Sequence, residues 1–142
     1  MNVALEKKRF GPWALVTGAS SGIGKEFARQ IAASGINVVL VARREDLLKE
    51  VGGEFSKRYG VEHRVVVLDF SREDFIRQLA SATDDLDIGL VVSNAGTPNP
   101  GQILKLDRQL LQATLRLNTM AHLDITHHFS FPSGGGRVSP NL

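Results

Sequence analysis

The sequence predicts an α/β fold in which a parallel β-sheet is covered by helices on both faces. Short apolar runs alternate along the chain with amphipathic segments, and within each run the apolar residues are continuous. A sheet with one solvated face would instead alternate apolar and polar residues. Continuous apolar strands joined by helical crossovers therefore favour a sheet that is buried on both faces.

Four strands are expected, and their apolar runs cover residues 14–16, 38–41, 65–68 and 88–92. Apolar positions recur at helical spacing between these runs, which predicts helices around residues 27–32, 47–55 and 75–79. A longer helix is expected after the fourth strand, from about Leu106 to about His128, with the Gly101 region leading into it. The predicted architecture is a Rossmann-type doubly wound parallel sheet, truncated after the fourth strand and the following helix.

Length and composition indicate one globular domain. The chain has 142 residues, of which 42% are hydrophobic and 23% charged. We expect residues 1–128 to form the domain and residues 129–142, which are rich in Gly, Pro and Ser, to form an irregular tail. The formal net charge of +2 gives no reason to expect a nucleic-acid partner.

Several classes of site and location are disfavoured. The absence of cysteine excludes disulfides, cysteine-ligated zinc and thiol nucleophiles. The four histidines lack the i, i+4 spacing of a helical metal-binding pair, so no metal is expected. No apolar run is long enough to span a membrane, and the first ten residues do not resemble a signal peptide, so a cytoplasmic location is expected.

A glycine-rich segment, Thr-Gly-Ala-Ser-Ser-Gly-Ile-Gly, follows the first strand directly and precedes an amphipathic helix. This context is typical of a loop that binds the pyrophosphate of a dinucleotide. The first glycine permits a sharp turn, the second lets the backbone approach the phosphate, and the third allows close packing of helix on strand. The residues expected to bind there are Gly18, Ser20, Ser21, Gly22, Ile23 and Gly24.

The end of the second strand favours NADP(H) over NAD(H). Enzymes of this fold that use NAD usually place an acid there to bind the ribose, whereas NADP enzymes provide a cation. The strand here ends with Val-Ala-Arg-Arg, and Arg43 is the candidate for the 2′-phosphate because a guanidinium matches phosphate in charge and geometry. Alternatively, Arg43 and Arg44 are solvated loop residues, and Glu45 or Asp46 contacts the ribose.

The spacing T-G-x-x-x-G-x-G resembles that of the short-chain dehydrogenase/reductase family, and the resemblance extends from about Trp13 to His128. The segments 11–14, 59–62 and 86–89 are similar to its hydroxysteroid dehydrogenase and very-long-chain ketoacyl-CoA reductase branch. The resemblance implies an oxidoreductase that transfers hydride between a nicotinamide cofactor and a carbonyl or alcohol. Lipid-like compounds are among the candidate substrates.

The resemblance also implies roles for residues after the third strand. Asp69 matches the family's aspartate at the adenine edge, and Phe70 matches the apolar residue that follows it. The alternative is that Asp69 caps the next helix, although Ser71 competes for that position.

Two further positions match family motifs. Ser93-Asn94-Ala95-Gly96 agrees at three of four positions with the family's N-N-A-G, which implies that Ala95 and Gly96 keep the backbone close to the ribose. Asn94 would tie neighbouring strands together, and the change to Ser93 is expected to weaken one hydrogen bond. Asn118 matches the helix asparagine of the family's proton relay, although an ordinary buried asparagine is an equal alternative.

The family's catalytic Tyr-x-x-x-Lys element is absent from these residues. The single tyrosine, Tyr59, is followed at the lysine position by His63, no lysine follows Lys105, and Ser139 has no tyrosine partner. We therefore expect the chain to bind cofactor without turning over alone, which leaves its status as an enzyme open. The alternatives are a non-catalytic interaction or cofactor-sensing module, with self-association through an exposed sheet edge, and a truncation or frameshift product.

Overall fold

The computed structural model describes residues 5–130 of the chain. Its centre is a four-stranded parallel sheet in the order β3-β2-β1-β4. This arrangement confirms the predicted doubly wound fold. The strands are β1 (Trp13–Thr17), β2 (Asn37–Ala42), β3 (His63–Val67) and β4 (Ile88–Val92).

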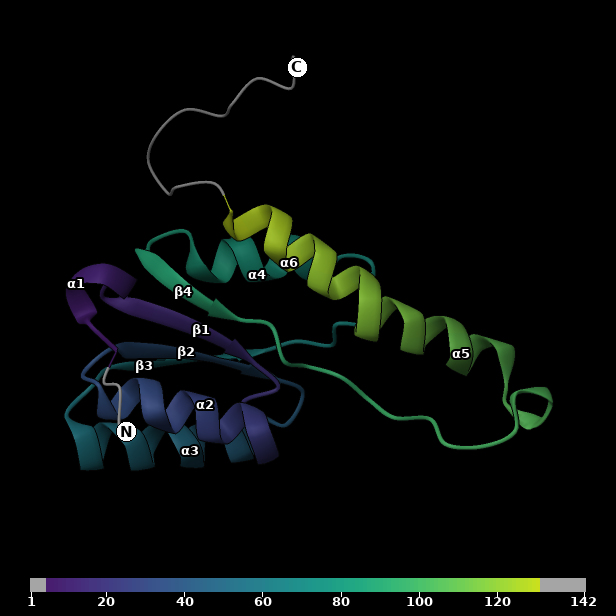
Figure 1. The fold of residues 1–142 in the computed structure, drawn as a ribbon, viewed down its shortest axis with the longest axis horizontal. Helices are drawn as coiled ribbons and strands as arrows, with labels where there is room; N and C mark the ends of the chain where they lie inside the picture. The colour runs from purple at the N-terminus through teal and green to yellow at the C-terminus, as the bar shows by residue number, and fades with distance from the viewer. Residues whose placement is uncertain (1–4, 131–142) are drawn as a thin grey trace, which may run out of the picture.

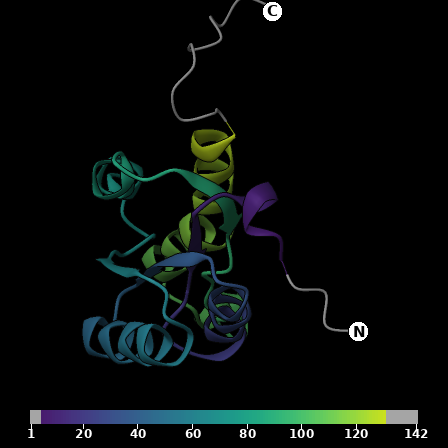
Figure 2. The ribbon, with the colours of Figure 1, turned by 90° about the vertical axis from the view of Figure 1, so that its left-hand side faces the viewer.

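Helices cover both faces of the sheet (Figure 1). On one face lie α2 (Gly22–Ala33) and α3 (Glu45–Tyr59), and on the other lie α4 (Phe75–Thr83) and α6 (Ala121–Phe129). The side view in Figure 2 shows the strands between these two helical layers. The first two crossovers, through α2 and α3, run on one face, and the third, through α4, runs on the other. Each crossover returns the chain to the same end of the sheet, as parallel pairing requires.

The central strands β1 and β2 are buried because they consist mainly of apolar residues. In β1 the positions from Ala14 to Thr17 are buried, and in β2 those from Val38 to Ala42 are buried. The register pairs Ala14 with Val38 and Val16 with Leu40. Both strands therefore bury side chains on their two faces, as their continuous apolar runs predicted.

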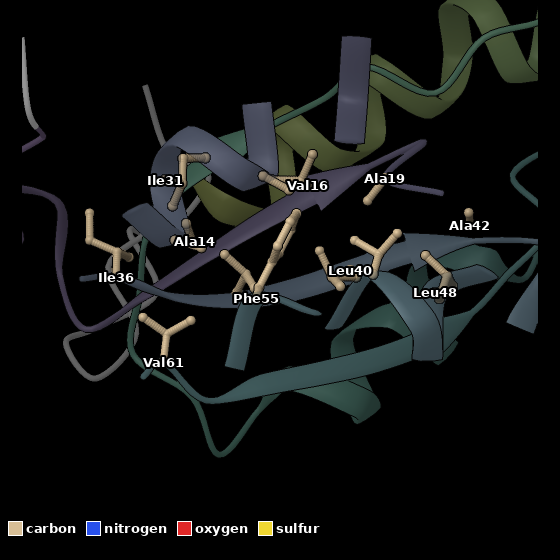
Figure 3. Close-up of a cluster of buried hydrophobic side chains, with 14 residues drawn as sticks. Ala14, Val16, Ala19, Ile31, Ile36, Leu40, Ala42, Leu48, Phe55 and Val61 are labelled. Atoms are coloured by element: carbon tan, nitrogen blue, oxygen red, sulfur yellow. The ribbon is translucent and has the colours of Figure 1, made fainter. Parts of the chain in front are cut away.

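The larger core cluster lies between the sheet and the helices α2 and α3 (Figure 3). Phe55 from α3 is fully buried and packs beside residues of β1, β2 and α2. The residues labelled in this view are Ala14, Val16, Ala19, Ile31, Ile36, Leu40, Ala42, Leu48, Phe55 and Val61. This core fixes the carboxyl ends of β1 and β2, from which the phosphate loop and the arginine pair emerge.

The structure differs from the prediction in several local features. Two short helical segments were not expected, α1 (Lys7–Phe10) and the 3₁₀ turn η1 (Ile103–Lys105). The long final helix consists of α5 (Arg108–Leu115) and α6, joined by a π-helical turn, η2 (Arg116–Met120). The third strand ends one residue before Leu68. The predicted irregular tail, 129–142, lies mostly outside the described residues.

No helix in the described part of the chain combines the length and the apolar character needed to cross a bilayer.

Candidate functional site

A cleft of about 260 Å³ opens at the carboxyl ends of the four strands. In a doubly wound sheet this edge is where ligands bind, at the point where the strand order reverses. Here the reversal lies between β1 and β4, on either side of which the chain crosses to opposite faces. The lining residues are Gly18, Ser20, Ser21, Ala42, Arg43, Arg44, Leu68, Asp69, Phe70, Asn94, Ala95, Gly96 and Leu117.

The first glycine of the loop turns the chain at the end of β1. Gly18 has φ +68°, and its N–H donates to the carbonyl of Val41 at 2.8 Å. A Cβ on Gly18 would lie 2.9 Å from the side-chain nitrogen of Asn94. A larger residue would therefore be strained in its backbone and would push against the β4 loop.

The first backbone N–H groups of α2 (Gly22–Ala33) lie next to its N-cap residue, Ser21, which lines the cleft. The N-cap residue, Ser21, makes no side-chain capping bond, so the first N–H groups of the helix keep their capacity to bind an anion. Gly22 has φ +58°, and a Cβ there would meet nothing within 4 Å. The backbone at Gly22 therefore has open space in front of it, as close approach of a phosphate requires.

Three of the predicted loop residues, Gly22, Ile23 and Gly24, do not line the cleft itself. Gly24 is buried, and a Cβ there would lie 2.3 Å from the carbonyl oxygen of Gly18, so its role is the close packing of helix on loop. The Ile23 side chain is 71% exposed, and neither residue lines the cleft. Ile23 could therefore serve an anion only through its backbone N–H, in the first turn of α2.

Arg44 bridges the phosphate loop and the end of β2. Its Nη2 donates to the hydroxyls of Ser20 and Ser21, at 3.0 and 2.8 Å. A guanidinium is thus held beside the α2 N-terminus by two neutral hydroxyls. Sequence reasoning named Arg44 only as a solvated alternative, because the contact depends on how the loop folds back across 24 residues.

Arg43, the residue predicted for the 2′-phosphate, also lines the cleft, and its charge acts on Asp69. Glu45 and Asp46, the alternative ribose ligands, are exposed in the first turn of α3 and do not line the cleft. The predicted role of Arg43 therefore stays a prediction, with its neighbour as the competing cation.

Asp69 forms a tight turn with Ser71. Its Oδ1 accepts from the Ser71 backbone N–H at 3.0 Å and from the Ser71 hydroxyl at 2.7 Å. Burial of Asp69 opposes its charge, but these bonds, with Arg43 and Arg72 nearby, hold its pKa below the usual value. The capping alternative is wrong, because α4 begins at Phe75 with Asp74 as its N-cap.

Phe70 is 2% exposed and meets Phe75 edge-on, with ring centroids 5.3 Å apart. It therefore belongs mainly to the core beneath the cleft and contributes only a small part of the lining.

A buried threonine organises the junction of β1 and β4. Thr17 Oγ1 accepts from the backbone N–H groups of Asn94 and Ala95, at 2.8 and 3.0 Å. The Asn94 side chain donates to the Thr17 carbonyl at 3.2 Å, so Asn94 does tie the two strands together. Sequence reasoning assigned Thr17 no role. The signal was available, since a polar residue at the end of a buried strand must find partners.

The Ser93 side chain makes a contact that the sequence did not predict, where only one weakened hydrogen bond was expected. Its hydroxyl lies 2.6 Å from Nδ1 of His122, in the first turn of α6. The pair links the end of β4 to the helix that covers it.

Asn118 lies in the π-helical turn and binds the backbone of Thr97, the residue that follows the segment Ser93 to Gly96. Its Oδ1 accepts from the Thr97 N–H at 2.9 Å, and its Nδ2 donates to the Thr97 carbonyl at 2.8 Å. Both polar atoms of the side chain are thus engaged with the loop. A part in proton relay stays a prediction.

Within residues 5–130, no three side chains of His, Asp or Glu gather closely enough to hold a metal ion. The residues that line the cleft offer backbone N–H groups, hydroxyls, an amide, a carboxylate and two guanidinium groups.

Comparison with known proteins identifies the family to which the chain belongs. The family model for short chain dehydrogenases matches residues 12–136. The chain belongs to the short-chain dehydrogenase family. The resemblance inferred from the glycine-rich loop is thereby confirmed.

Two groups of relatives are similar in sequence to this short-chain dehydrogenase. The 7β-hydroxysteroid dehydrogenase of Collinsella aerofaciens is 37% identical over 123 residues, which is 87% of this chain and 47% of the relative. The very-long-chain 3-oxoacyl-CoA reductase of Anas platyrhynchos is 44% identical over 87 residues, which is 61% of this chain and 28% of the relative. The chain spans about half the length of the hydroxysteroid dehydrogenases, and less of the reductases.

Solved structures of family members share the fold. A 7β-hydroxysteroid dehydrogenase structure superposes with a TM-score of 0.84 at 36% identity, over 87% of this chain and 48% of the other. The L-sorbose reductase of Gluconobacter frateurii, complexed with NADPH and L-sorbose, has a TM-score of 0.77 at 28% identity, over 83% and 46% of the two chains.

Proposed function

We propose that the chain is the NADP(H)-binding part of a short-chain dehydrogenase. The observation that carries this proposal is the guanidinium of Arg44, held by the hydroxyls of Ser20 and Ser21 beside the uncapped start of α2. Positive charge, hydroxyl groups and free backbone N–H groups converge there on one side of the cleft. These groups favour a ligand that carries two separate phosphate groups, one for the guanidinium and one for the N-terminus of α2.

The residues present fit a dinucleotide along the whole cleft. Gly22 and the start of α2, which follow Ser21 at the border of the cleft, would hold the pyrophosphate. Asp69 and Leu68 would face the adenine, and Asn94 to Gly96 would face the second ribose. When bound, the cofactor exchanges a hydride with a carbonyl or alcohol carbon. The substrate of the whole protein would be a carbonyl or alcohol compound, with the lipid-like substrates named for the relatives as candidates.

Two cations compete for the 2′-phosphate that distinguishes NADP(H) from NAD(H). Arg43 is partly compensated by the nearby Asp69, whose pKa it helps to lower. Arg44 is held by neutral hydroxyls, which leave its positive charge available. We therefore assign Arg44 the main contact and Arg43 a supporting one. Family members in complex with NADPH support the choice of cofactor.

The test is a titration of the pure chain with NADPH and with NADH, followed by nicotinamide fluorescence. We expect tighter binding of NADPH, and Arg44→Ala should weaken NADPH binding by at least about tenfold, the loss expected for one charge-assisted phosphate contact. NADH binding should change little, and Arg43→Ala should have a smaller effect. Arg108→Ala, on α5 and outside the cleft lining, is the matched control.

The outcomes separate the possibilities. Equal weakening of NADPH and NADH in Arg44→Ala would move that residue to the pyrophosphate. A larger loss in Arg43→Ala would restore the assignment made from the sequence. Failure of both dinucleotides to bind the wild-type chain would refute the proposed function.

The chain alone is not expected to catalyse the reaction. The Tyr-x-x-x-Lys element that protonates and positions the substrate in this family does not occur in its 142 residues. NADPH mixed with the pure protein and a panel of ketones should therefore show no oxidation above the protein-free rate. Sustained oxidation that depends on protein concentration would contradict this expectation.

A second role, self-association, is favoured by the edge of the sheet. In the described residues β4 pairs only with β1, and a groove of about 210 Å³ runs between its outer edge and α6. An unpaired, uncharged strand is a template for another strand. We propose that two copies of the chain associate through this edge.

A further inference from the structure

We propose that the short turn η1 and the start of α5 dock the chain on an anionic membrane surface. The contact is peripheral, since two side chains enter the lipid and no helix crosses it. The inference does not depend on the proposed binding of NADP(H), because the residues that carry it do not line the cleft.

The apolar tip, Ile103 and Leu104, projects from the rest of the fold. The segment between β4 and α5 runs away from the sheet, and the turn lies at its far end (Figure 1). Leu104 is 97% exposed and Ile103 is 70% exposed. Scattered apolar side chains on a surface are ordinary, but two large neighbours this exposed indicate a site of interaction.

The turn is held in shape before any contact is made. The Lys105 N–H donates to the Gln102 carbonyl at 2.8 Å, and the Leu106 N–H donates to the Ile103 carbonyl at 3.3 Å. Leu106 folds back against Gly101, where an added Cβ would lie 3.3 Å from Leu106 Cδ2. One apolar side chain of the segment therefore packs inward, while the apolar tip points outward and needs little ordering to bind.

The charges beside the apolar tip favour an anionic partner. Lys105 and Arg108 are exposed, and in residues 5–130 neither forms an ion pair. The acid between them, Asp107, caps α5 by accepting from the Leu110 N–H at 3.0 Å. Its negative charge thus faces the positive end of the helix dipole. Two cations are left to meet negative headgroups.

The shape of the apolar tip favours a bilayer over a protein partner. A stable protein interface buries roughly 800 Å² on each partner, and a turn of three residues cannot supply that area. A lipid leaflet requires no matching groove, because acyl chains rearrange around inserted side chains. Lys105 can keep its ammonium group among the headgroups while its methylene stem follows the apolar tip inward.

The experiment measures flotation of the full chain, without cofactor, on vesicles of two compositions. One set contains phosphatidylcholine with about a quarter phosphatidylserine, and the other contains phosphatidylcholine alone. Leu104→Ser removes apolar surface from the tip, and Leu123→Ser is its matched control, since Leu123 is 61% exposed on α6. Lys105→Gln removes a cation beside the tip, and Lys57→Gln removes the same charge from α3.

A fluorescent label reports insertion directly. The chain has no cysteine, so Leu104→Cys and Leu123→Cys each provide one attachment point for an environment-sensitive dye. With anionic vesicles, we expect the dye at position 104 to brighten and shift to shorter wavelength and the dye at position 123 to stay unchanged. Equal responses at both positions would overturn the inference.

We expect wild type to bind anionic vesicles, with Leu104→Ser at least about tenfold weaker and Lys105→Gln about fivefold weaker. The two matched controls should bind like wild type. No binding of wild type to anionic vesicles, or equal binding to both compositions, would overturn the inference. An oligomer of the lipid-free chain that Leu104→Ser dissociates would also overturn it, because a second copy would then cover the apolar tip.

Discussion

Asp69 shows how a single carboxylate is kept charged at the border of the cleft. The Ser71 hydroxyl and backbone N–H stabilise the ionised form, and the guanidinium groups of Arg43 and Arg72 act in the same direction. Together they outweigh the opposing effect of burial, so the pKa is lower than the usual 3.8. The Asp69 carboxylate is thus available to accept a hydrogen bond from the exocyclic amine of the adenine proposed to bind there, or to offset the positive charge of Arg43.

This lowered pKa predicts a pH-dependent contribution to stability. A carboxyl whose folded pKa lies below its unfolded value contributes fully above the unfolded value and loses the contribution as pH falls through the folded value. Asp69→Asn removes the titrating carboxyl group. The free energy of unfolding of wild type should therefore exceed that of the variant by about 1 kcal/mol at pH 7. The difference should shrink as pH falls below 3.8.

Urea unfolding of both proteins at several pH values between 7 and 3 measures this difference. Ser71→Ala provides the matched variant, because it removes one of the two bonds and leaves the carboxyl in place. A difference between wild type and Asp69→Asn that stays constant, or grows, as the solution is acidified would contradict the assignment.

At the residue scale, sequence patterns predicted contacts that depend on local geometry. Of the contacts made across the fold, they predicted the tie from Asn94 to the neighbouring strand and missed those of Arg44, Thr17 and Ser93. The turn at Gly18 follows from its place between strand and helix, and the structure gives it φ +68°. The partners of Arg44 and of Asn118 lie 23 and 21 residues away in the chain. Only the packed fold brings these groups together, so no local pattern could reveal them.

At the element scale, α2 packs so closely on the phosphate loop that only a small residue fits at position 24, in the first turn of the helix. Gly24 lies against both the Gly18 carbonyl and the Asn94 amide, where a Cβ would be 2.3 and 2.5 Å away. These neighbours are a backbone atom and a bonded side chain, and neither can yield easily. The packing therefore requires glycine.

We expect Gly24→Ala to destabilise the protein by roughly 1–3 kcal/mol, because the loop must shift to admit the methyl group. Gly53→Ala is the matched control in the interior of α3, where a Cβ meets nothing within 4 Å. That change should stabilise the protein by about 0.5–1 kcal/mol through helix propensity. Urea unfolding gives both values, and equal stability of the two variants would contradict the packing argument.

The order and type of the main elements follow from periodicity, whereas breaks within an element do not. Apolar runs predicted the four strands because both faces of the sheet are buried in the same way. The π-helical turn over Arg116–Met120 was missed because its residues continue the helical pattern of Arg108–Leu115 without Pro or Gly. Its position depends on the fit of Leu117 and Asn118 to the cleft and the loop.

At the scale of the whole molecule, the two edges of the sheet differ in chemistry. The β3 edge carries His63 and Arg64, and Arg64 binds Asp85 at 2.8 Å and the Ala82 carbonyl at 2.9 Å. Charged residues on an edge strand discourage pairing with other chains. The β4 edge is the uncharged sequence Ile-Gly-Leu-Val-Val, and its apolar residues are only partly buried. We therefore expect the proposed self-association to occur at β4 rather than at β3.

Blocking the groove beside β4 should prevent this association. Thr126 is exposed on α6 and lines the groove, so Thr126→Lys places a charge where an added strand would pack. We expect the wild-type chain to become dimeric with rising concentration and Thr126→Lys to require at least about tenfold more protein. Thr119→Lys adds the same charge outside the groove and should associate like wild type. Light scattering coupled to size-exclusion chromatography measures the mass of each, and a wild-type chain that stays monomeric, or two variants that behave alike, would show that the β4 edge is not the contact.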